Sequence, residues 1–119
     1  MKRLALFSLI LTLAPLLAEE EHKQKPISLT ATVVDTGCYM AHDSSGADHK
    51  TCALTCAKKG VPLALVDDSG KVYSLIGMDH QNPNAKLLPF IEKKVKVEGT
   101  LFEKGGSAGV WVKTVTEAK

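Results

Sequence analysis

Apolar and polar residues alternate along residues 27–34, which is the pattern of a strand with one buried face. We expect this strand to continue to Met40, with Gly37 marking a bend or bulge. On a strand, Cys38, Met40 and His42 would all point to the same side. The first predicted element therefore carries a row of sulfur and imidazole groups near its end.

Four more strands are predicted further along the chain. Two short apolar stretches, 63–66 and 72–76, flank an Asp-Asp-Ser-Gly turn and predict a β-hairpin. The alternation returns over residues 94–102 and again over residues 110–113, on either side of a Gly-Gly turn. These two stretches predict a second pair of neighbouring strands.

Two helices are predicted between the strands. Residues 49–59 follow Asp48, a good N-cap, and end before Gly60, which suits the left-handed position after a helix. A second helix is expected to begin at Pro83, and Pro89 should kink or shorten it.

The predicted order is strand, helix, strand, strand, helix, strand, strand. Five strands with a helix between the third and fourth indicate a mainly β fold, an OB-like Greek-key barrel. The cysteine-bearing helix is then an insertion between the first two strands. The alternative is an open antiparallel sheet with two helices on one face. We expect a single domain over residues 27–116, preceded by a flexible linker at 19–26.

Residues 1–18 have the three parts of a secretory signal peptide. Lys2 and Arg3 precede an apolar run, and Ala18 stands before an acidic triplet. The run is short for a membrane span and is broken by Pro15, although an uncleaved membrane anchor is the alternative. We therefore expect export to the periplasm or the extracellular space, with no transmembrane segment in the mature chain.

The charge balance bears on the class of partner. The chain has 15 Lys and Arg residues against 13 Asp and Glu residues, and removal of residues 1–18 leaves 13 of each. A neutral domain is not expected to bind nucleic acid, which requires a basic surface. An envelope protein is the partner class that export suggests, while the sequence specifies no oligomeric state. No phosphate loop, dinucleotide fingerprint or Ser-His-Asp set is present, so no catalytic residue is assigned.

All three cysteines lie between residues 38 and 56. On a helix, His49, Cys52 and Cys56 would share one face, because their spacing is close to one and two turns. If that face packs against the side of the strand that carries Cys38, the four residues form a Cys₃His set, which is a standard zinc sphere. Thiolates also suit Cu(I), so we expect copper or zinc. Further candidate ligands are Met40, His42, Met78 and His80.

Two other uses of the cysteines remain open. A Cys38–Cys52 or Cys38–Cys56 disulfide would staple a binding module and leave one free thiol. Cys52 and Cys56 would not pair with each other, because Cβ atoms at this helical spacing lie about 5–6 Å apart and a disulfide needs about 3.8 Å. The second alternative is a thiol-disulfide redox protein, although the C-x-x-C motif of such proteins is absent.

Asp35 stands three residues before Cys38. A carboxylate at this position can orient a ligand histidine. It can also serve a turn, which is the more frequent role of such a residue.

Five segments of the chain carry a resemblance to known proteins. They are VVDTGCYMAH, DHKTCALTCAKKGVPLALV, KVYSLI, QNPNAKLLPFI and KVKVEGTLF. Through them, nearly all of residues 27–116 resembles a group of small exported bacterial proteins. The resemblance implies an OB-like barrel and places Cys38, His49, Cys52 and Cys56 at the distinctive positions of the group. It implies no particular reaction.

Overall fold

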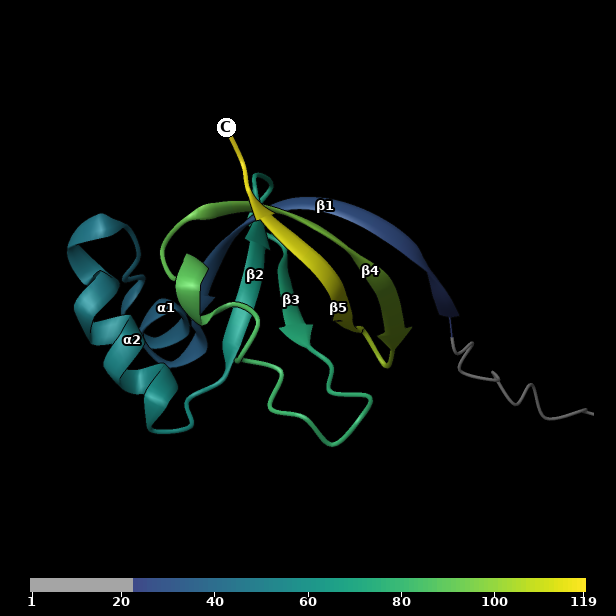
Figure 1. Cartoon of the computed structure of the whole chain (residues 1–119), viewed down its shortest axis with the longest axis horizontal. Coiled ribbons are helices and arrows are strands. Elements are labelled where there is room, and N and C mark those ends of the chain that lie inside the picture. The colour runs from purple at the N-terminus through teal and green to yellow at the C-terminus, as the bar shows by residue number, and fades with distance from the viewer. Residues whose placement is uncertain (1–22) are drawn as a thin grey trace, which may run out of the picture.

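In the computed structural model, which describes residues 23–119, the alternating stretches of the chain form five strands. These are β1 (Lys23–Asp35), β2 (Leu63–Asp67), β3 (Val72–Leu75), β4 (Lys94–Lys104) and β5 (Ser107–Glu117). They close a barrel in the order β1-β2-β3-β5-β4 (Figure 1). Strands β3 and β5 pair in parallel, whereas the other neighbours pair antiparallel. This is the OB-like order, so the predicted fold class is confirmed.

The core of the barrel comes from the apolar positions of the alternating pattern. Ala31 and Val33 of β1 and Val95 and Val97 of β4 are fully buried, on strands that pair along most of their length. In β2 residues 63–66 are buried on both faces, and Tyr39 of α1 packs against the residues of the outer face. This continuous apolar strand anchors the end of the barrel that carries the helices.

Tight turns join the strands of both hairpins. Lys104 pairs with Ser107, which leaves Gly105 and Gly106 as a two-residue turn with φ angles of 57° and 77°. Two positive φ angles define the hairpin turn that matches the twist of the strands, and glycine adopts them without strain. The predicted turn between β2 and β3 is also present, with Val66 paired to Val72.

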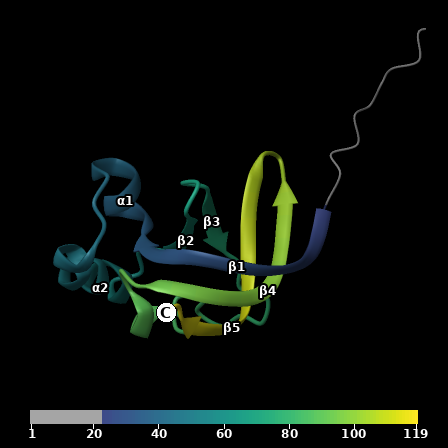
Figure 2. The ribbon, with the colours of Figure 1, turned by 90° about the horizontal axis from the view of Figure 1, so that it is seen from above.

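The helices lie together at one end of the barrel (Figures 1 and 2). Helix α1 (Thr36–His42), the 3-10 turn η1 (Ala47–His49) and helix α2 (Lys50–Lys58) connect β1 to β2. A short 3-10 turn, η2 (Leu88–Phe90), precedes β4. Within residues 23–119, no helix is both long and apolar enough to cross a membrane.

The first strand differs from its prediction at both ends. It ends at Asp35 and the chain then enters α1, so the expected extension to Met40 is wrong. It begins at Lys23, and residues 23–26 pair with β4. This part of the expected linker 19–26 is therefore part of the barrel. The predicted signal peptide at 1–18 and the rest of the linker lie outside the described residues.

The helices and the bulge also differ from their predictions. Asp48 lies within η1 and does not cap α2, which begins without a side-chain cap. Gly60 ends the helix as expected, with a φ of 99°. The helix expected from Pro83 is reduced to turns and to η2, which contains Pro89. No bulge occurs at Gly37. The irregular register lies instead between β4 and β5.

Candidate metal site

Cys38 is positioned by the abrupt change from β1 to α1. Asp35 caps the helix, since its Oδ1 accepts a hydrogen bond from the Cys38 backbone N–H at 2.9 Å. The backbone N–H and the hydroxyl of Thr36 both donate to the Pro62 carbonyl oxygen at 2.9 Å. These bonds tie the start of α1 to the start of β2 and fix Cys38 in the first turn of the helix.

Cys52 and Cys56 come from α2 and lie one helical turn apart. The adjacent face of α2 carries Ala53 and Ala57, which are buried in the core of the barrel. The small alanine side chains allow the helix to pack closely on the barrel. The two cysteines are thereby presented at its flank, with Cys56 half-buried and Cys52 exposed.

The sulfur atoms of the three cysteines lie close together. The Sγ atoms of Cys38, Cys52 and Cys56 all lie within 4.8 Å of one another, and no disulfide joins them. A tetrahedral zinc ion with Zn–S bonds of about 2.3 Å keeps its sulfur ligands about 3.8 Å apart. The separation of the three sulfur atoms is therefore compatible with one shared ion.

His49 lies beside the cysteines and is held by Glu92. The His49 Nδ1 atom is 3.2 Å from Glu92 Oε1, and Glu92 Oε2 accepts a 2.7 Å hydrogen bond from the Gly46 backbone N–H. The side chain of Glu92 is fully buried, and its backbone has a left-handed φ of 59°. Its N–H donates to the Val33 carbonyl oxygen at 2.8 Å. Glu92 thus ties the loop before α2 to the barrel.

Asp35 lies beside His49 on the buried side of the cluster. It is fully buried, and its Oδ2 has no hydrogen-bond partner within residues 23–119. This oxygen lies 3.6 Å from His49 Nδ1. Ligand atoms of Asp35, Cys38 and His49 lie within 4.8 Å of one another, so they form a second group that shares Cys38 with the group of three cysteines. Within each of these two groups, the ligand atoms therefore lie at distances at which they could hold a metal ion.

The surroundings of the thiols disfavour their ionisation when no cation is present. Burial, the negative charge of Asp35 and the neighbouring thiols, in that order, raise the pKa of Cys38 from 9.0 to about 12. Burial and the charge of Cys52 raise the pKa of Cys56. A bound cation reverses this effect, because a thiol that coordinates a metal ion is deprotonated.

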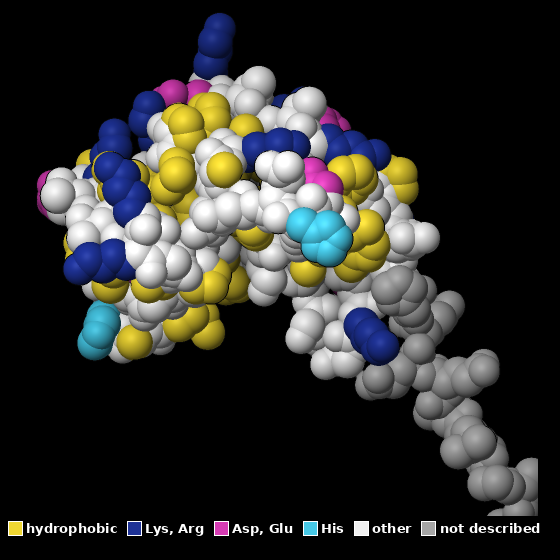
Figure 3. Space-filling view, turned by 60° about the horizontal axis from the view of Figure 1, so that its bottom comes forward, with side chains coloured by type: hydrophobic (Ala, Val, Ile, Leu, Met, Phe, Trp, Pro, Cys, Tyr) yellow, Lys and Arg dark blue, Asp and Glu magenta, His cyan; other side chains and the backbone are white. Residues whose placement is uncertain are grey.

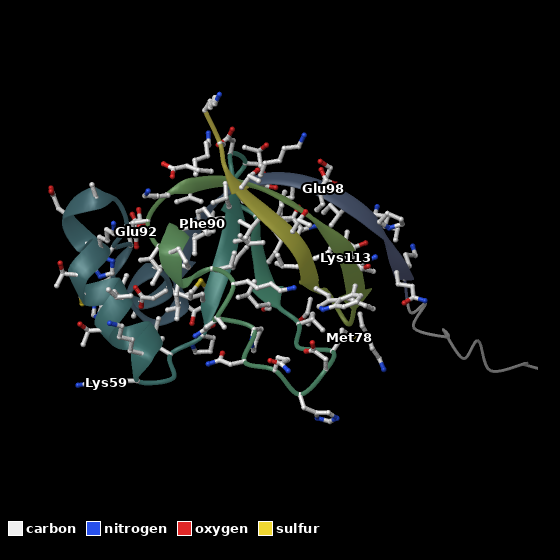
Figure 4. The ribbon with its side chains drawn as sticks, in the orientation of Figure 1. Lys59, Met78, Phe90, Glu92, Glu98 and Lys113 are labelled. Atoms are coloured by element: carbon white, nitrogen blue, oxygen red, sulfur yellow. The ribbon has the colours of Figure 1, made fainter. Side chains whose placement is uncertain are left out.

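The structure does not bring the further candidate ligands to the cluster. Because residues 38–42 form a helix and not a strand, Met40 points away from Cys38 and is 69% exposed. His42 is exposed at the end of α1 and belongs to neither ligand group. Met78 lies in the loop after β3, well apart from Glu92 and the two helices (Figure 4). His80 is exposed in the same loop and also belongs to neither group.

Sequence reasoning missed part of the cluster. His49 was expected on the same helix face as Cys52 and Cys56, but it precedes α2 and groups with Asp35 and Cys38. Asp35, which the sequence predicts either to orient a histidine or to serve a turn, both caps α1 and faces His49. Glu92 was not a candidate, because only the pairing of β1 with β4 brings it close.

A pocket of about 150 Å³ lies elsewhere, between the loop after β3 and strand β5. Its walls include Ile76, Pro83, Lys86 and Trp111, but none of the residues of the cysteine cluster. Figure 3 brings this side of the barrel forward and shows apolar side chains at the surface with lysines among them. The pocket carries no group of metal ligands.

Comparison with protein-family models, curated proteins and solved structures finds no match to this chain. The resemblance to small exported bacterial proteins therefore stays a prediction.

Proposed function

We propose that this protein is an exported metal-binding protein that holds copper or zinc through Cys38, Cys52 and Cys56, with His49 beside them. Export rests on the signal-like pattern of residues 1–18. The role would be metal handling in the cell envelope, or support of an envelope redox system through a protein partner. No catalytic residue is part of the proposal.

One observation carries this proposal. Three free sulfur atoms from two separate helices lie within 4.8 Å of one another at the surface of the barrel. Thiolates bind zinc and Cu(I) in preference to magnesium or calcium. Three thiolates suit Cu(I), and they also suit zinc, which takes one further ligand to complete its four-coordinate sphere.

A thiol-disulfide redox role has less support. Such a role needs a thiol with a lowered pKa, because the thiolate is the nucleophile. The pKa values of Cys38 and Cys56 are instead raised by burial and by neighbouring negative charge. These two thiols are therefore poor nucleophiles in the metal-free protein.

Thiol counting tests the proposal. Protein is isolated from its native compartment, its metal content is measured, and reactive thiols are titrated with and without a chelator. We expect bound copper or zinc, with three thiols that react only after the metal is removed. A Cys52→Ser variant is the control. It should retain little metal because it lacks one thiolate ligand, and it should still fold because Cys52 is exposed.

Two results would contradict the proposal. One reactive thiol, whether or not chelator is present, would indicate a disulfide that leaves a single free cysteine. Three reactive thiols before chelation, with no metal found, would show that the cluster does not hold an ion.

A further inference from the structure

The cluster contains two ligand groups that have only Cys38 in common. One group consists of Cys38, Cys52 and Cys56, and the other of Asp35, Cys38 and His49. Within residues 23–119, no group joins His49 to Cys52 and Cys56 within 4.8 Å. The ligands of a single tetrahedral ion lie less than about 4 Å apart, as metal–ligand bonds of about 2.0–2.3 Å require. One ion at the three sulfur atoms would therefore leave Asp35 and His49 without a metal.

We propose that the site holds two metal ions that share the Cys38 thiolate as a bridging ligand. The first occupies the thiolate position, formed by Cys38, Cys52 and Cys56. The second occupies a mixed position, formed by Asp35, Cys38 and His49, and is a borderline divalent cation such as Zn²⁺. This inference rests on the proposed function for the thiolate position and adds a second ion to it.

The free oxygen of Asp35 supports the mixed position independently. Oδ1 of this carboxylate is used to cap α1, whereas the buried Oδ2 has no hydrogen-bond partner among the described residues. A buried carboxylate oxygen without a hydrogen bond is costly, and buried charges are normally paired or coordinate metal ions. Oδ2 faces His49 Nδ1 at 3.6 Å, so a cation beside both atoms would satisfy the carboxylate.

The charges of the cluster also fit two ions. With one divalent ion, three thiolates carry one negative charge in excess, and the buried carboxylates of Asp35 and Glu92 add two more. A second divalent ion removes most of this excess. Glu92 Oε1 also lies 3.2 Å from His49 Nδ1, so a second carboxylate charge lies beside the mixed position.

Zinc titration under reducing conditions tests this inference. Full-length protein is titrated with Zn²⁺ in competition with a chromophoric chelator, and we expect two equivalents per chain. Asp35→Asn should bind one equivalent, because the amide oxygen still caps α1 but the second position loses its carboxylate. His49→Ala provides a second route to the same loss and should also bind one equivalent. His42→Ala is the matched control and should keep two, since His42 is exposed outside both groups.

A parallel titration with Cd²⁺ identifies the remaining ion. The ultraviolet absorption of cadmium–thiolate bonds should persist at the first equivalent in Asp35→Asn, which shows that the thiolate position is intact. One equivalent in the unmodified protein, with this absorption present, would overturn the second ion and leave the proposed function standing. No binding at all would overturn both. Two equivalents in both Asp35→Asn and His49→Ala would also overturn the mixed position.

Discussion

Asp35 uses its two carboxylate oxygens for different purposes. Oδ1 caps α1 through the backbone N–H of Cys38, and Oδ2 faces His49 without a hydrogen bond. The position of the Cys38 backbone and the charge around its sulfur are therefore set by the same residue. Asparagine can still cap α1, since its amide oxygen accepts a hydrogen bond. It cannot supply the negative charge near the Cys38 sulfur, since the amide is neutral.

We predict that Asp35→Asn lowers the pKa of Cys38 in the metal-free protein. The charge of Asp35 is the second cause of the raised value, after burial, so the pKa should fall but stay above 9.0. The measurement is the pH dependence of alkylation in a Cys52→Ser/Cys56→Ser background, with and without the Asp35 substitution. An unchanged or higher pKa would show that the carboxylate is not charged in the folded protein.

At the scale of single residues, some members of the cluster can be predicted from the sequence and others cannot. The spacing of Cys52 and Cys56 places them on one helix face, as predicted, because helical geometry depends only on sequence separation. Glu92 stands in an ordinary charged stretch before β4, and its left-handed backbone leaves no mark in the sequence. Its closeness to His49 depends on the pairing of strands far apart in the chain.

Among the elements, α1 was the hardest to predict. It is a seven-residue helix with no buried residue. Its sequence therefore lacks the regularly spaced apolar residues by which a helix that packs on a core is recognised. Hydrogen bonds from Thr36 to Pro62, together with the cap from Asp35, hold it in place. The Gly37 that suggested a bulge in a strand lies instead in the first turn of this helix.

The hairpin between β2 and β3 is stabilised by the carboxylate of Asp67. Its Oδ1 accepts hydrogen bonds from the backbone N–H groups of Ser69 and Lys71 and from the Ser69 hydroxyl, and its Oδ2 accepts one from the Tyr73 hydroxyl. These bonds, with that from the Ser69 hydroxyl largest, lower the pKa of Asp67 below 3.8. Stability from this group is therefore present above pH 3.8 and is lost as the pH falls through the lower, folded-state pKa.

We predict that Asp67→Asn lowers the free energy of unfolding at neutral pH and weakens its decline in acid. The asparagine side chain cannot ionise, so it loses the stabilisation that the carboxylate gains above pH 3.8. Urea denaturation at several pH values measures both effects. Asp68→Asn is the control, because Asp68 is 77% exposed and pairs only at the surface with Lys94. Equal changes in the two variants would contradict this role of Asp67.

Strand β4 requires a glycine at its irregular register with β5. Glu98 pairs with Thr114 and Gly99 with Val112, so Lys113 has no paired residue on β4 and forms a bulge. A Cβ atom on Gly99 would collide with the carbonyl oxygen of Trp111 and lie 3.3 Å from the Val112 Cα. The two backbones can approach closely only because this residue has no side chain.

We predict that Gly99→Ala lowers the free energy of unfolding by about 1–3 kcal/mol, the usual cost of overpacking. Chemical denaturation measures this effect. Gly37→Ala is the matched control, since a Cβ there would meet only the Val61 side chain at 3.4 Å and Asp35 Oδ1 at 3.6 Å. Alanine is also favoured over glycine within a helix by about 0.5–1 kcal/mol. A loss at Gly37 as large as that at Gly99 would contradict the account of the bulge.

The whole molecule joins a closed barrel to a helical insertion that contains the sulfur cluster. The barrel could be predicted from the order and alternation of its strands. The register of its closing pair could not, because the parallel β3–β5 pairing involves only two residue pairs, Ser74 with Gly109 and Leu75 with Val110. The start of β1 has no strand pattern in the sequence, since residues 23–25 are polar and, like Pro26, exposed; they are part of the barrel through pairing with β4.

We predict that zinc stabilises the helical insertion more than the barrel. An ion held by Cys38 of α1 and Cys52 of α2 would cross-link two helices that are otherwise joined by a loop. At a free zinc concentration 100 times the Kd, the free energy of unfolding should rise by about 2.7 kcal/mol. Hydrogen exchange should slow most over residues 36–58. The same slowing in Cys52→Ser would show that the effect does not come from the thiolate site.

The central claim is that Cys38, Cys52 and Cys56 form one thiolate site, and zinc-edge X-ray absorption tests it most directly. The protein is loaded with one equivalent of Zn²⁺, which should fill the thiolate position first because thiolates are its strongest ligands. The account predicts three sulfur neighbours at about 2.3 Å from the ion. A shell made only of nitrogen and oxygen, or one with fewer than three sulfur atoms, would contradict it.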